Sequence, residues 1–258
     1  MKQFKLALIQ MKVEGGNRTA NLMRAEKMIS EAADNSAKVV LLPEALNLGW
    51  THPSALLEAE KVPEGKTSKF LIRQAKKKGL YICCGLIEKD GEKVYNSAVI
   101  INSDGEIILK HRKINELDIG LNYYSTGDSI NVCKTEFGTF GLAICADAFD
   151  SANLEALGKL GADIILSPCS WATPKEHNNL DAPYGSEWEK SYIPIAKKFS
   201  LWIAGCSNVG WITDGPWKDR KCIGNSLIVN PKGYIAASGP YGVDAEEILY
   251  FEINNEEP

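Results

Sequence analysis

The sequence has no long apolar run and no excess of basic residues. A helix that crosses a membrane needs about 20 predominantly apolar residues in succession, and no run here approaches that length. The 258 residues carry a formal net charge of -4, which gives no electrostatic reason to expect nucleic acid or an anionic membrane as a partner. Lys5 interrupts the apolar N-terminal stretch and no small-residue cleavage site follows it, so the stretch predicts a first β-strand and a cytoplasmic protein.

Histidine is also scarce, and sequence patterns for metal binding are missing. The three histidines, His52, His111 and His177, lie far apart, and no CxxC or HExxH motif occurs. We therefore expect no metal site. The cysteines are odd in number and irregular in spacing, which favours free thiols over a disulfide framework. There are seven of them: Cys83, Cys84, Cys133, Cys145, Cys169, Cys206 and Cys222.

Apolar β-type runs alternate with helical patterns along the chain, without a linker or a low-complexity tract. This order predicts a single α/β domain over residues 1–258, with helices covering the sheets. Helices are expected after the N-cap residue Asn17 and over Thr67–Lys78, Ser151–Leu160 and Glu187–Ser200, where Pro194 predicts a break or a late start. Strands are expected over Phe4–Met11, Lys38–Leu42, Leu80–Ile87, Val94–Asn102, Glu106–Lys110, Thr139–Cys145, Asp163–Ser167, Leu201–Ser207, Cys222–Asn230, Gly233–Ser238 and Glu246–Ile253.

Three potentially reactive side chains stand where predicted strands end. Glu44 follows an apolar strand and Pro43, Lys113 follows another strand, and Cys145 closes a third. Strand ends favour active-site residues because the sheet fixes the backbone while the loop frees the side chain. Each residue alone also has an ordinary explanation, as a solvated carboxylate, a basic surface turn or a buried structural cysteine.

Taken together, these motifs resemble those of the nitrilase, or carbon–nitrogen hydrolase, superfamily. The matching segments are Pro43-Glu44, Arg112-Lys113 and Ile144-Cys145-Ala146-Asp147, and the similarity continues through Lys159–Trp171 and Asn230–Gly233. The resemblance implies an α-β-β-α sandwich, a catalytic triad of Glu44, Lys113 and Cys145, and pairing into a homodimer or a higher homo-oligomer.

The chemistry that the resemblance implies is hydrolysis of a small C–N compound through a thioester. Cys145 would attack the substrate carbon, and Glu44 would take its proton and later activate water. Lys113 would stabilise the developing oxyanion, with the backbone N–H of Ala146 as a second donor. No cofactor is required, and the partner is a small-molecule substrate.

The sequence departs from the family pattern in two places. Many relatives carry a second glutamate between the lysine and the cysteine, and here the only glutamate in that loop is Glu116, which can have this role or be a solvated carboxylate. Many relatives also carry arginine shortly after the cysteine, where this chain has Ala148 and Phe149. The missing arginine favours a neutral or cationic substrate, unless another arginine such as Arg220 substitutes for it.

Aromatic residues gather in the segment Trp171–Trp188, which also contains Tyr184. This mixture of rings and polar groups predicts either a pocket wall or lid, or a packed surface loop. Asn208 closes a predicted strand and is a further candidate for substrate binding.

Three functional hypotheses follow from the sequence. The first is an amidase-type hydrolase, and the second is a nitrile hydrolase with the same three residues. The third is a binding or scaffold protein that has lost activity, which the missing arginine suggests and the intact Glu44, Lys113 and Cys145 oppose. Faster alkylation of Cys145 than of the other six cysteines would favour a live site over a scaffold.

Overall fold

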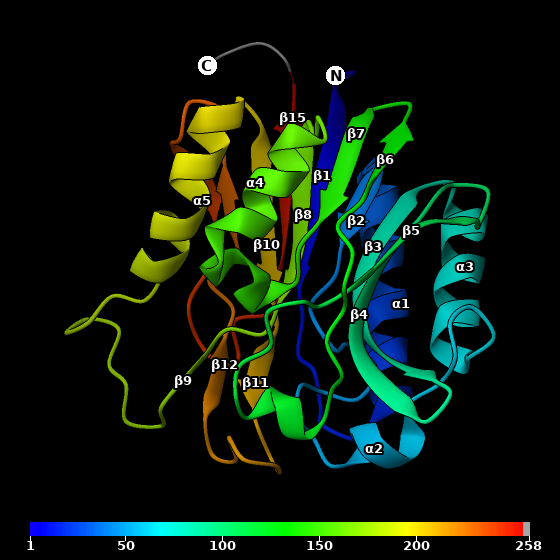
Figure 1. Ribbon diagram of the computed structural model, residues 1–258, viewed down its shortest axis with the longest axis vertical. Coiled ribbons are helices and arrows are strands. Elements are labelled where there is room, and N and C mark those ends of the chain that lie inside the picture. Colours follow the sequence, from blue (N-terminus) through cyan, green and yellow to red (C-terminus); the bar gives the residue numbers. More distant parts are fainter. Residues whose placement is uncertain (255–258) are drawn as a thin grey trace.

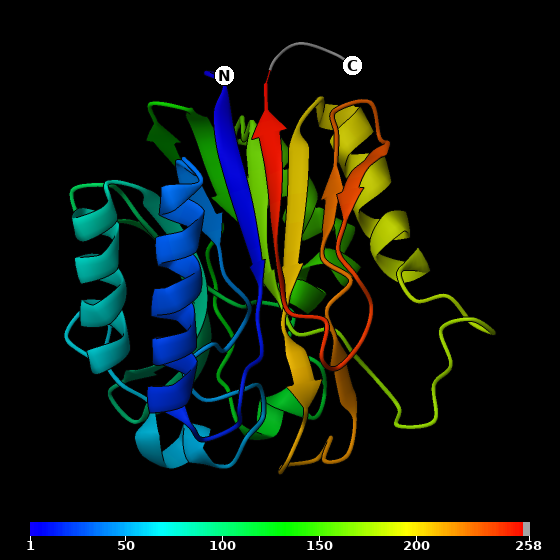
Figure 2. The same ribbon diagram turned by 180° about the vertical axis from the view of Figure 1, so that it is seen from behind.

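The computed structural model describes residues 1–254 and contains two six-stranded sheets packed face to face (Figures 1 and 2). The first sheet has the order β15 (Glu247–Ile253), β1 (Phe4–Gln10), β2 (Val39–Leu41), β3 (Tyr81–Asp90), β4 (Lys93–Ile101), β5 (Ile107–Arg112). The second has the order β14 (Ile235–Ser238), β13 (Leu227–Val229), β10 (Trp202–Ser207), β8 (Ile164–Cys169), β7 (Gly138–Leu142), β6 (Val132–Thr135). A small third sheet joins β11 (Val209–Trp211), β12 (Lys221–Ile223) and β9 (Ala172–Thr173).

Helices cover the outer face of each large sheet. In Figure 2, α1 (Arg18–Asp34) and α3 (Lys66–Lys78) lie against the first sheet, while in Figure 1 α4 (Ser151–Lys159) and α5 (Ser186–Phe199) lie against the second. Shorter helical turns are α2 (Ser54–Glu58), η1 (Gly120–Asn122) and η2 (Cys145–Phe149). This layering confirms the α-β-β-α sandwich that the sequence predicts.

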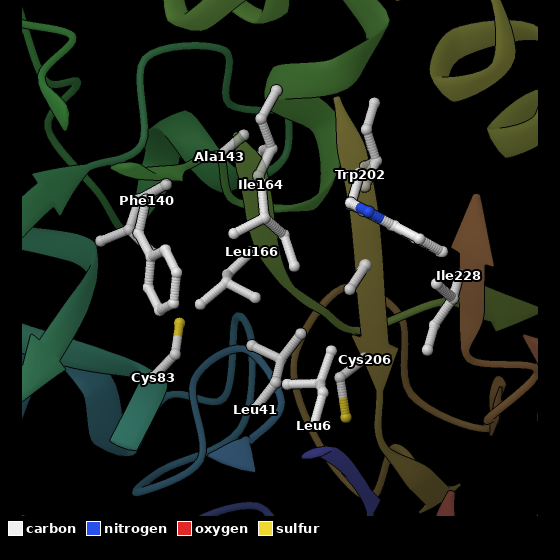
Figure 3. Close-up of a cluster of buried hydrophobic side chains, with 14 of the residues drawn as sticks. Leu6, Leu41, Cys83, Phe140, Ala143, Ile164, Leu166, Trp202, Cys206 and Ile228 are labelled. Carbon is white, nitrogen blue, oxygen red and sulfur yellow. The ribbon is translucent and has the colours of Figure 1, made fainter. Parts of the chain in front are cut away.

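The sequence places apolar residues on both faces of the central strands. In β1, Leu6 and Leu8 belong to the cluster between the two sheets, whereas Ala7 and Ile9 belong to the cluster under the helices. Figure 3 shows the inner layer, where Leu41 and Cys83 of the first sheet point toward Leu166 and Phe140 of the second. Successive side chains of a strand point to opposite faces of the sheet. Because both faces are covered here, one by the other sheet and one by helices, both sets of side chains must be apolar. The fully buried sheets form a rigid base for the loops at their ends.

Helix ends follow their capping residues. The Asn17 side chain accepts a hydrogen bond from the Ala20 N–H (3.2 Å) at the start of α1. Gly79 ends α3 with a φ of 62°, a left-handed conformation that glycine adopts without steric cost. The Pro194 prediction was wrong, because α5 begins at Ser186 and continues through Pro194 to Phe199. No helix within residues 1–254 is both long and apolar enough to cross a membrane.

Two predicted strands differ from the structure. The segment Cys222–Asn230 is two strands in different sheets, β12 and β13, because Gly224 and Asn225 between them have φ values of 64° and 61° and turn the chain. The strand predicted to reach Cys145 ends at Leu142, and Cys145 instead begins the short helical turn η2. Cys145 therefore lies beyond the strand, in the turn that follows it.

Candidate active site

Glu44 lies just beyond β2, between the two large sheets. Its backbone N–H donates to the Cys169 carbonyl at the end of β8 (3.2 Å), which links the two sheets at this point. The side chain is 1% exposed, and its Oε1 accepts from Lys113 Nζ (2.9 Å) and from Asn96 Nδ2 (2.7 Å). These two donors on one oxygen fix the position of the carboxylate.

The backbone around Glu44 is packed so closely that glycine is required beside it. A Cβ atom on Gly85 would lie 2.5 Å from the Glu44 Cα and 2.9 Å from the Pro43 carbonyl oxygen. Both distances are shorter than an ordinary van der Waals contact. Any other residue at position 85 would therefore displace the backbone of Pro43 and Glu44.

Lys113 follows β5 and is buried between two carboxylates. Its Nζ lies 2.9 Å from Glu44 Oε1 and 3.5 Å from Glu116 Oε2, and its side chain is 1% exposed. Its backbone N–H donates to the Asn96 carbonyl (2.8 Å) on the neighbouring strand β4, which fixes where the side chain starts. Asn96 thus contacts Glu44 through its side chain and Lys113 through its backbone.

Cys145 begins the turn η2 with a φ of 45°, a left-handed conformation that costs a residue with a side chain on the order of 1–3 kcal/mol. Asp147 supports this turn from inside. Its carboxylate accepts from the backbone N–H groups of Ile144 (2.8 Å), Ile114 (2.9 Å) and Asn115 (2.8 Å). One buried carboxylate therefore ties the cysteine turn to the residues directly after Lys113.

His111 completes this link from the strand that leads to Lys113. Its Nε2 lies 2.8 Å from Asp147 Oδ2, and the Asn115 side chain donates to the Ala146 carbonyl (2.6 Å). The Asp147 carboxyl is buried, which disfavours its charge, but the His111 ring and the backbone donors outweigh burial and lower its pKa. Asp147 consequently favours its ionised form and holds the turn of Cys145 against the residues that follow Lys113.

Burial and charge set the protonation of the central groups. Burial and the nearby Glu44 carboxylate raise the pKa of the Cys145 thiol well above its usual range, and Lys113 only partly opposes them. Burial disfavours the Lys113 ammonium, yet Glu116 and Glu44 outweigh it and raise its pKa. Burial raises the pKa of Glu116, against the pull of Lys113. The resting site accordingly holds a neutral thiol beside a charged ammonium.

A cavity of about 380 Å³ opens above these groups. Its walls are mainly aromatic, and Phe149, Trp188 and Trp171 form a stack with ring centroids 4.8 and 4.7 Å apart. The lining residues are Glu44, Trp50, Lys113, Leu117, Cys145, Ala146, Phe149, Ser170, Trp171, Ala172, Thr173, Pro174, His177, Tyr184, Glu187, Trp188, Trp217 and Arg220.

The structure brings together most of the residues that the sequence selects. Glu44, Lys113, Cys145 and Ala146 line the cavity, together with the aromatic candidates Trp171, Tyr184 and Trp188. Glu116 lies behind Lys113, with a buried carboxylate rather than a solvated one. Asn208, the remaining candidate for substrate binding, lines a separate small hollow. Its carbonyl accepts the Gly224 N–H (3.0 Å), and Ser170 and Trp50 line both the hollow and the cavity.

Sequence reasoning missed several residues of the site. Asn96 is a polar residue within an apolar strand, a signal that could have marked it. Asp147 is part of the cysteine motif and His111 directly precedes Arg112-Lys113, but their contact depends on the fold. Within residues 1–254, no group of three or more histidine, cysteine, aspartate or glutamate side chains is arranged to hold a metal ion.

Comparison with known proteins gives a consistent assignment. The sequence profile of the carbon–nitrogen hydrolase family matches residues 5–257. The chain is 33% identical to a protein named nitrilase from Pyrococcus abyssi (90% of this chain, 83% of the relative) and 31% identical to the omega-amidase NIT2 of Xenopus tropicalis (92% and 84%). Among solved structures it resembles Saccharomyces cerevisiae Nit3, a member of the nitrilase superfamily, with a TM-score of 0.84 and 27% identity over 98% of this chain and 91% of the other. With a profile match over nearly its whole length, this chain belongs to the carbon–nitrogen hydrolase family of enzymes.

Proposed function

We propose that this enzyme hydrolyses a small amide through a thioester on Cys145, with Glu44 as proton carrier and Lys113 as oxyanion stabiliser. The observation that carries this proposal is the buried Lys113 ammonium, held 2.9 Å from Glu44 and 3.5 Å from Glu116 at a cavity that Cys145 also lines. Two buried carboxylates around one ammonium, next to a thiol, form an arrangement for acyl transfer rather than for packing.

The first step is attack of the Cys145 sulfur on the amide carbon. Because burial keeps the thiol neutral at rest, the proton must leave as the sulfur attacks, and Glu44 is the carboxylate that accepts it. The C–S bond forms and the carbonyl oxygen gains negative charge. Lys113 has three N–H donors and two carboxylate neighbours, so one N–H remains to stabilise that oxygen, together with the Ala146 backbone N–H.

Collapse of this intermediate breaks the C–N bond. Glu44 returns the proton to the departing nitrogen, which leaves as ammonia or an amine, and the acyl group stays on sulfur as a thioester. Glu44 then removes a proton from water as the water attacks the thioester; the C–S bond breaks, Glu44 returns that proton to the Cys145 sulfur, and the acid is released. Asn96 and Lys113 hold Glu44 Oε1 through both steps, so the same carboxylate serves as base and as acid.

A nitrile is the second candidate substrate, because the relative from Pyrococcus abyssi is named a nitrilase. The Cys145 sulfur can also add to a nitrile carbon, with Glu44 carrying the thiol proton to the nitrile nitrogen and Lys113 stabilising the charge that develops there. We favour the amide because six relatives of 28–31% identity carry the name omega-amidase.

The test is ammonia release from matched small amides, carbamoyl compounds and nitriles, by the wild type and by Cys145→Ala. We expect release from amides first, and a loss of at least about 10³-fold on substitution, since the nucleophile is removed. Cys222→Ala, which changes a buried cysteine outside the cavity, is the matched control and should retain activity. Equal rates for wild type and Cys145→Ala would refute the mechanism.

A further inference from the structure

One arginine on the cavity wall has no acidic partner. Arg220 lies directly before β12, in the loop of residues 212–220 that joins β11 to β12. Its guanidinium packs over the Trp217 ring, with Cζ 4.3 Å from the ring centroid. Within residues 1–254, no ion pair or side-chain hydrogen bond includes this guanidinium, although five N–H donors are available.

The loop that carries Arg220 is held by its own backbone. The Arg220 N–H donates to the Trp217 carbonyl (3.0 Å), and the Ile212 N–H donates to the Arg220 carbonyl (3.0 Å). The neighbouring Lys221 Nζ donates to the carbonyl of His177 (2.8 Å), another residue that lines the cavity. The guanidinium is thus presented from a fixed position, as a pre-organised binding group would be.

Two rings connect Arg220 to the reactive centre. The Trp217 ring packs edge-on against Trp50, with centroids 4.8 Å apart, and the Trp50 ring centroid lies 5.6 Å from Lys113 Nζ. All four residues line the same cavity. Lys113 therefore lies at one end of this aromatic wall, and Arg220 at the other. A substrate whose amide carbon meets Cys145 would extend along the wall toward Arg220.

The other polar groups of the cavity favour a ligand group that accepts hydrogen bonds at the Arg220 end of the wall. Glu187 also lines the cavity, but it is exposed and stands in the first turn of α5, where the helix N-terminus stabilises a carboxylate without any ligand. The indole N–H groups of Trp50 and Trp171 are buried and have no acceptor among the described residues. The unpaired groups of the wall are thus mainly donors, which match oxygen atoms of a ligand.

We propose that Arg220, presented by Trp217, binds a carboxylate at the end of the substrate remote from the scissile bond. The preferred substrates are then small amides with a terminal carboxylate. This inference rests on the proposed function of the cavity. Ala148 and Phe149 alone suggest a neutral or cationic substrate. The proposed subsite replaces that preference, because Arg220 supplies the positive charge from a different loop.

The test uses three aliphatic amides of equal length that end in a carboxylate, in an isopropyl group of the same shape, or in an ammonium group. For the carboxylate amide, Arg220→Glu should lower kcat/KM about 100-fold, since a bidentate charged contact is lost and a repulsive charge is added. The isopropyl amide should change by no more than about twofold, and the ammonium amide should improve. Arg220→Lys should lie between, because lysine keeps the charge and loses the planar fork.

The matched control is Arg73→Glu, which removes another arginine stacked on an aromatic ring, with Cζ 5.9 Å from the Phe70 centroid and outside the cavity. It should leave the order of the three amides unchanged. An equal loss for all three amides in Arg220→Glu would overturn the proposal, since that is the result expected if Arg220 only stabilises its loop.

Binding to the Cys145→Ala protein separates this inference from the proposed function, because it requires no turnover. Calorimetry should give a dissociation constant for the carboxylate amide that rises about 100-fold when Arg220→Glu is added. If the wild type released no ammonia while this dependence held, the proposed reaction would fail and the subsite would stand. If the wild type hydrolysed amides but the dissociation constant did not change, the subsite would be refuted.

Discussion

Replacing Glu44 with glutamine is expected to lower kcat by about 10²–10⁴-fold with little change in the fold, because only the proton-accepting function is removed. The glutamine oxygen can still accept from Asn96 and Lys113, which now donate at 2.7 and 2.9 Å, so the side chain should keep its place. Initial rates of ammonia release, with circular dichroism as a check of folding, measure the effect.

Glu88→Gln is the matched control for this experiment. Glu88 is likewise buried, at 2% exposure, and it pairs with Lys110 (2.6 Å) and Arg112 (2.8 Å), but it lies outside the cavity. Its substitution should lower the Tm and leave kcat close to the wild-type value. Similar kcat losses in Glu44→Gln and Glu88→Gln would mean that Glu44 acts only through stability.

Replacing Lys113 with methionine should damage both stability and catalysis. The substitution leaves Glu44 and Glu116 buried without their shared cation, and breaking a buried ion pair in this way costs about 3–5 kcal/mol. Loss of the oxyanion partner should in addition lower kcat by about 10²–10³-fold. Urea unfolding gives the first quantity, and steady-state kinetics at a temperature where the variant is folded gives the second.

Lys110→Met, on the strand β5 that precedes Lys113, provides the comparison. Lys110 also pairs with a buried glutamate, Glu88, but its side chain is 35% exposed and Arg112 remains as a second partner. We expect a cost of no more than about 1 kcal/mol and an unchanged kcat, as for other partly exposed pairs. A Lys113→Met variant as active as Lys110→Met would exclude Lys113 from the reaction.

The strand ends of the site could be predicted from the sequence because each lies next to a strong local signal. The run before Pro43-Glu44 is apolar throughout and buried on both faces, so its end is visible without the fold. The strand before Lys113 begins with three apolar residues, Ile107–Leu109, and then carries Lys110, His111 and Arg112, so its signal is weaker. The φ of 45° at Cys145 was not predictable from local sequence, because the Asp147 carboxylate that supports this turn accepts hydrogen bonds from Ile114 and Asn115, 33 and 32 residues earlier.

Other features depend on contacts between distant segments. Asn96 reaches Glu44 only because β3 lies between β2 and β4 in the sheet, an order that no local pattern contains. Likewise, Arg220 joins the cavity wall because Trp217 packs on Trp50, some 170 residues earlier in the chain. The alternation of strand and helix patterns along the sequence predicts the layers of the fold. Which side chains share the cavity depends on how the strands pair and the loops pack, and no local pattern contains this information.

The central claim is a covalent thioester on Cys145, and mass spectrometry of the acid-quenched enzyme during turnover tests it most directly. Acid protects a thioester, so the intact protein should gain the mass of the acyl group, and digestion should place that mass on the peptide that contains Cys145. The adduct should disappear when the substrate is exhausted and should never form in Cys145→Ala. Steady ammonia release with no adduct on Cys145, or an adduct on another of the seven cysteines, would contradict the account.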